Sequence, residues 1–164
     1  MSMLVRFTKN APVDAADLLT CVRPDGSTTS DVMARQGILP HDAFHFVVES
    51  TLGWNEAFFG RVAGGASLAE VSAEQHDGPA GRPQLTQARQ AEALIDCLQN
   101  TQWGGATAPA AFANDLAAAC RRRRVLPPTV TPEDLGRVRV ALREFGAAWR
   151  PLRAGASLER RFGP

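Results

Sequence analysis

The sequence predicts an α+β fold, in which a small antiparallel sheet packs on a layer of about five helices. Two observations point to this class. Alternating apolar and polar residues near both ends of the chain are typical of strands with one buried face. The long region between them carries apolar residues at helical spacing, with no strand–helix–strand alternation that would indicate a parallel sheet. The length of 164 residues fits a single domain spanning residues 1–164.

The strands are expected in three parts of the chain. Apolar side chains at every second position predict a first strand over residues 3–8. Residues 18–33 predict a hairpin, because two strand-like runs flank a turn that contains Pro24 and the Asp25-Gly26 pair. Residues 158–162 alternate again and predict a last strand that completes the sheet.

The helices are expected between these strands, with glycine or proline at each break. Thr131 offers an N-cap, Pro132 suits the first helical position, and acidic residues follow in the first turn. A capping-box pattern at Ser67 predicts one or two further helical turns. Residues 74–83 are polar and predict an exposed loop in which His76 is solvated. The main helices are predicted over residues 41–52, 55–62, 84–101, 109–124 and 131–149.

The composition excludes several classes of protein. Apolar residues make up 45% and charged residues 21%, which excludes a disordered chain, a collagen-like repeat and a disulfide-stapled miniprotein. The three cysteines form no Cys-x-x-Cys pair, so neither a zinc knuckle nor a disulfide framework is indicated. The first residues lack the apolar core of a secretion signal, and residues 97–114, the longest uncharged stretch, are too polar to span a bilayer. We therefore expect a cytoplasmic bacterial protein with reduced, buried thiols.

The net charge of +1 hides a segregation of charge along the chain. Residues 1–120 carry seven basic and thirteen acidic groups, whereas residues 121–164 carry eleven basic and four acidic groups. Because no nucleic-acid-binding motif accompanies the arginines, we expect them to pair with acidic residues within the fold or across a homodimer. The alternative function from this region is a non-enzymatic interaction module, whose arginine-rich third binds an acidic partner or nucleic acid.

The segment of greatest chemical interest is the predicted helix 41–52. Its residues are apolar nearly all round, which predicts a buried helix. One narrow sector is polar and contains His41, Asp42, His45 and Glu49. Since burial of unpartnered imidazole and carboxylate groups costs several kcal/mol, this sector must face a solvent cleft, pair internally or bind a ligand.

Three interpretations of the polar sector remain open. In the first, His41 and His45 chelate a divalent metal, with zinc as the expected ion, because residues four apart lie on one helix face. In the second, Glu49 or Asp42 orients His45 as a general base without a metal. In the third, the sector is structural, with Asp42 at the helix N-terminus and the histidines bonded to core backbone.

The metal interpretation requires a carboxylate from elsewhere in the chain. His41 and Glu49 lie about 12 Å apart along an ideal helix, which is too far for one ion unless the helix bends. Asp42 and Glu56 are the nearest candidates for a further ligand. The corresponding function is a metal-dependent hydrolase or lyase acting on an unknown small molecule, with Glu49 or Glu56 as third ligand or general base.

Two resemblances involve the same helix. A group of uncharacterised bacterial proteins resembles the first seventy or so residues, through Leu39-Pro40-His41-Asp42-x-x-His45-Phe46-x-Val48-Glu49, Leu52-Gly53 and Phe58-Phe59-Gly60; this resemblance implies no activity. The run His41-Asp42-x-x-His45 is also similar to the signature of a ubiquinone-biosynthesis assembly family. There the motif and a later glutamate bind a divalent metal, usually taken as zinc, in an all-helical fold. The resemblance implies metal ligation by His41, Asp42, His45 and Glu56. In this chain, however, Ala57 stands at the glutamate position, and the predicted strands depart from that fold.

Overall fold

Four antiparallel strands form one sheet in the order β3-β2-β1-β4. The strands are β1 (Met3–Thr8), β2 (Ala16–Val22), β3 (Thr28–Ala34) and β4 (Ser157–Phe162). The computed structural model describes residues 1–14, 16–35, 37–76, 85–102 and 107–164. The predicted α+β class is confirmed, including the hairpin and the last strand, which pairs with β1.

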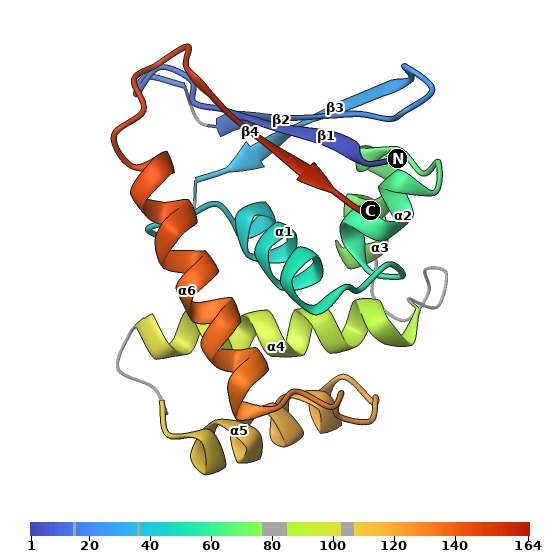
Figure 1. Cartoon of the computed structure of the whole chain (residues 1–164), viewed down its shortest axis with the longest axis vertical. Helices are drawn as coiled ribbons and strands as arrows, with labels where there is room; N and C mark the ends of the chain where they lie inside the picture. The colour runs from blue at the N-terminus through green and yellow to red at the C-terminus, as the bar shows by residue number, and fades with distance from the viewer. Residues whose placement is uncertain (15, 36, 77–84, 103–106) are drawn as a thin grey trace.

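One face of the sheet is buried because the strands alternate as the sequence predicts. In β1 the side chains of Met3, Val5 and Phe7 are buried and their neighbours are partly exposed. Leu158 and Phe162 of β4 continue the buried face on one side. Beyond β2, the edge strand β3 contributes the buried Met33. This face meets the first helix and closes the upper half of the core (Figure 1).

Helix α1 (His41–Leu52) lies between the sheet and the remaining helices. All seven residues from Ala43 to Glu49 are buried, because the helix is covered on almost every side. It ends at Gly53, whose φ of 68° lies in the left-handed region that favours glycine. The helix therefore carries its polar side chains into the interior of the protein.

The other helices complete a layered arrangement. The sheet, α1, α4 (Thr86–Gln102) and α5 (Pro109–Arg122) follow one another, and α6 (Pro132–Trp149) runs along one side and packs on α1 (Figure 1). Thr131 caps the start of α6 as predicted, and together with Asp134 it forms a capping box. The two shorter helices are α2 (Phe58–Ala63) and α3 (Leu68–His76).

The polar segment that we predicted as an exposed loop begins later than expected. Residues 74–76 belong to the last turn of α3, which extends the short helix expected from Ser67. Residues 77–83 lie outside the described part of the chain. The side chain of His76 also lies outside it, so its predicted solvation stays a prediction.

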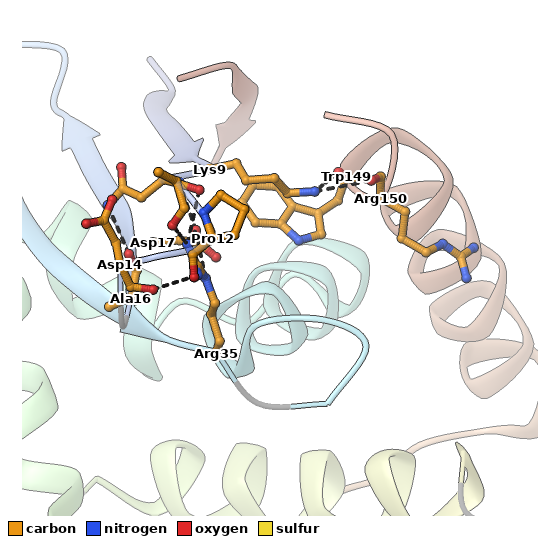
Figure 2. Close-up of polar contacts among 10 residues, drawn as sticks. Lys9, Pro12, Asp14, Ala16, Asp17, Arg35, Trp149 and Arg150 are labelled. Carbon is orange, nitrogen blue, oxygen red and sulfur yellow. Dashed lines mark hydrogen bonds and ion pairs between the residues drawn. The ribbon is translucent and has the colours of Figure 1, made fainter. Parts of the chain in front are cut away.

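The connection between β1 and β2 is tied to distant parts of the chain (Figure 2). The guanidinium of Arg35 donates to the buried carboxylate of Asp17 at 2.9 Å and to the backbone oxygen of Asp14 at 2.6 Å. Lys9 Nζ donates to the backbone oxygens of Trp149 at 2.8 Å and Arg150 at 3.2 Å. These bonds hold the loop against the end of β3 and the carboxyl end of α6. A cavity of about 260 Å³ adjoins them.

Candidate metal centre

Helix α1 brings its two histidines together at the interior edge of the core. Residues four apart share a helix face, and the rings of His41 and His45 lie 4.9 Å apart between centroids. The side chain of His45 is 1% exposed, whereas that of His41 is 28% exposed. The pair therefore runs from the buried interior at His45 toward solvent at His41.

Glu92 of α4 faces both histidines. Its Oε1 lies 2.7 Å from His45 Nε2, and its Oε2 lies 3.3 Å from His41 Nε2. Among the residues that the structure describes, His41, His45 and Glu92 form a group that could hold a metal ion, with one ligand atom of each within 4.8 Å of the others. Two imidazole nitrogens and a carboxylate oxygen are ligands that zinc binds in proteins.

Glu49 approaches His45 from the opposite side. Its Oε2 lies 3.3 Å from His45 Nδ1, and its Oε1 accepts backbone N–H groups from Phe59 at 2.8 Å and Gly60 at 3.2 Å. Both of these hydrogen bonds to Glu49 Oε1 require the start of α2 to lie close to α1. A Cβ on Gly60 would lie 2.1 Å from the carbonyl carbon and oxygen of Asn55, so only glycine permits this approach.

The charges of this cluster depend on one another. Burial would lower the pKa of His45, but its hydrogen bonds to Glu49 and Glu92 outweigh burial and raise that pKa to about 10. Burial acts to raise the pKa of Glu92, yet the contacts with His41 and His45 hold it well below its usual range. Burial raises the pKa of Glu49. His45 therefore carries a positive charge beside carboxylates, which is the charge that a bound cation would replace.

Gln99 adds a polar neighbour on the exposed side of the centre. Its amide nitrogen lies 3.4 Å from His41 Nδ1. Gln99 is seven residues after Glu92, so it lies on the same face of α4 about two turns further on. Each histidine thus has a polar contact on Nδ1 and faces Glu92 with Nε2.

The other predicted site residues lie apart from this group. Asp42 is partly buried at the start of α1, where burial raises its pKa, and it lies near the histidines without joining the three candidate ligands. Glu56 is exposed, and its contact in the structure is a backbone N–H that donates to Gln87 Oε1. The structure therefore brings together His41, His45 and Glu49 from our predicted set.

The metal interpretation predicted a carboxylate from elsewhere in the chain, but Glu92 was not among the predicted residues. A signal was present, because Glu92 lies four residues after Ala88 and three before Ile95. These positions share the apolar side of the predicted helix 84–101. An acidic residue inside an apolar stripe marks a buried charge that needs a partner.

The arginine-rich third is partly paired within the fold. Arg123 forms an ion pair with Asp96, and Arg137 pairs with Asp134 at 2.6 Å. Arg139 donates to the backbone oxygen of Thr107 at 3.1 Å. The Arg123–Asp96 pair agrees with the expected pairing between the arginine-rich third and the acidic part of the chain, whereas Arg137 pairs within this third and Arg139 bonds a backbone oxygen.

Within the described ranges, no helix is long and apolar enough to cross a membrane. Cys21, Cys97 and Cys120 are free thiols, and all three are buried. Comparison with protein-family models, with curated proteins and with solved structures gave no match for this chain.

Proposed function

We propose that this chain is a divalent-metal-binding protein whose ligands are His41, His45 and Glu92, with zinc as the best-fitting metal. The observation that carries this proposal is the convergence of their ligand atoms within 4.8 Å from two different helices. The mixed nitrogen and oxygen donor set is one that catalytic zinc sites use. Magnesium and calcium prefer oxygen ligands, which makes them weaker candidates.

The position of the centre supports exchange of a metal or small molecule with solvent. His41 is 28% exposed and Glu92 is 12% exposed, so the centre reaches solvent on that side. A bound zinc ion would polarise a substrate and lower the pKa of a coordinated water. The class of activity we propose is therefore hydrolysis or lyase chemistry on a small molecule. Use of His45 as a metal-free general base is disfavoured, because both ring nitrogens already face carboxylates inside the core.

Metal analysis of the untagged protein tests the proposal. We expect about one equivalent of zinc after dialysis against zinc and then against metal-free buffer. The double variant His41→Ala plus His45→Ala, and the single variant Glu92→Gln, should retain much less. Glu144→Gln is the matched control, because Glu144 is exposed on α6, and it should retain the wild-type amount.

Folding of each variant should be checked by circular dichroism, since His45 is buried. If folded wild-type protein binds no stoichiometric zinc, manganese or iron, the proposal is wrong. His41, His45 and Glu92 would then serve only to satisfy one another inside the core.

A further inference from the structure

The imidazole of His45 is held at both of its nitrogens. Nδ1 lies 3.3 Å from Glu49 Oε2 and Nε2 lies 2.7 Å from Glu92 Oε1. The ring also stacks near Phe58, with 5.1 Å between centroids. Because the side chain is 1% exposed, a proton on either nitrogen faces a carboxylate rather than water.

Glu49 does not share the position of Glu92. It contacts Nδ1 of His45, whereas Glu92 contacts Nε2, so Glu49 is not among the three candidate metal ligands. A metal-binding histidine commonly donates its other ring N–H to a carboxylate, which orients the ring and raises its basicity as a ligand. An ionised carboxylate can only accept hydrogen bonds, so this contact keeps a proton on Nδ1 when a metal displaces the proton from Nε2.

The orientation of Glu49 is itself fixed. Its side chain is fully buried, and its Oε1 accepts from the backbone of Phe59 and Gly60. These two bonds leave Oε2 directed at His45. The start of α2 thereby sets the direction of an α1 side chain, which in turn sets the direction of the His45 ring.

We infer that Glu49 is the positioning residue of this centre: it selects the His45 tautomer that leaves Nε2 available to the metal. The inference rests on the proposed function, since it assigns a role to Glu49 only if His45 is a ligand. It replaces the two roles that the sequence suggested for Glu49, third ligand and general base. Glu49 would touch neither the metal nor a substrate.

The variant Glu49→Gln separates this role from a merely structural one. The glutamine carbonyl can still accept from Phe59 and Gly60, so the start of α2 keeps its hydrogen bonds. The glutamine NH₂ group then faces His45 Nδ1 and donates to it. Nδ1 must therefore give up its proton, and the proton moves to Nε2, the nitrogen that would bind the metal.

We expect zinc affinity of folded Glu49→Gln to fall about 10- to 100-fold, the range found for partners of metal-binding histidines. Zinc titration with a competing chelator measures this change. Glu144→Gln should match wild type. Nitrogen chemical shifts of the imidazoles report the tautomer directly: His45 of zinc-loaded wild type should be protonated on Nδ1, and His45 of the variant on Nε2.

The outcomes distinguish the two proposals. If wild type binds no metal, the proposed function fails. If wild type binds zinc through His45 and Glu49→Gln binds it equally well, the proposed function stands and the positioning role is wrong. The tautomer measurement on wild type needs no variant, so a zinc-loaded His45 protonated on Nε2 would overturn the inference even if Glu49→Gln failed to fold.

Discussion

At the scale of single residues, the candidate centre depends on atoms that are not themselves ligands. The carboxylate of Glu49 accepts hydrogen bonds from two backbone N–H groups at the start of α2, those of Phe59 and Gly60. Gly60 packs so closely on Asn55 that no side chain fits between them. Gly60, which has no side chain, thus controls how closely α2 approaches α1 beside the histidines.

Substitution of Gly60 by alanine should be strongly destabilising. The added Cβ would lie 2.1 Å from backbone atoms of Asn55, which cannot rotate away. We expect the free energy of unfolding to fall by about 3 kcal/mol or more. Urea denaturation measures the change.

Gly136→Ala is the matched control for that substitution. Gly136 lies within α6, and nothing lies within 4 Å of a Cβ added there. Because alanine is a better helix former than glycine, the free energy of unfolding of this variant should rise by about 0.5–1 kcal/mol. Equal effects of the two alanine substitutions would contradict the packing described at Gly60.

The buried thiols should be chemically inert in the folded protein. Burial raises the pKa of Cys21 to about 12 and that of Cys97 to about 11, from an ordinary value of 9.0. At pH 8 few of these thiols ionise, and the thiolate is the reactive form. We expect a thiol-specific disulfide reagent to modify native protein slowly and to modify all three cysteines rapidly in urea.

The same pKa shifts have a defined effect on stability. Above pH 9 the unfolded thiols lose protons while the folded ones keep them, so unfolding becomes more favourable as the pH rises from about 9 toward 12. The free energy of unfolding of Cys21→Ser should fall less over this pH range than that of wild type, as measured by urea denaturation at each pH. Rapid modification of native wild type at pH 8 would show that the thiols are accessible.

At the scale of elements, the sequence was sufficient wherever a pattern is local. Alternation in β1, the Asp25-Gly26 turn and the N-cap at Thr131 each depend on neighbouring residues, and all appear in the structure. The polar sector of α1 could also be predicted, because helical spacing alone places His41 beside His45.

The parts that the sequence could not supply are contacts between elements. Glu92 lies far from the histidines in sequence, and only the packing of α4 on α1 brings it to them. Likewise, Glu49 was recognised as important, but its partners Phe59 and Gly60 depend on how α2 returns to α1. Periodicity identifies a buried charge without identifying the element that neutralises it.

At the scale of the whole molecule, the candidate centre joins two halves of the layered structure. His41 and His45 lie on the helix that packs beneath the sheet, whereas Glu92 lies on the helix that packs on α5 (Figure 1). A metal held by all three side chains would therefore link these layers. Because binding would favour the folded state, the metal should raise global stability.

We expect zinc to raise the melting temperature of wild-type protein. Free zinc at 100 times its dissociation constant would add about 2.7 kcal/mol, if unfolded protein binds none. Calorimetry with zinc, compared with calorimetry in a chelator, measures the shift. Glu92→Gln should show a much smaller shift, and an equal shift in that variant would place the zinc elsewhere.

The pairing of β1 with β4 has a consequence for synthesis of the chain. Arg6 of β1 and Glu159 of β4 form an ion pair at 2.7 Å across 153 positions of sequence. A growing chain on the ribosome would present β1 with one edge unpaired until residues 157–162 emerged, and open strand edges promote association with other chains. This edge of β1 can close only after β4 has been synthesised, so it stays open while all the helices between the two strands are made.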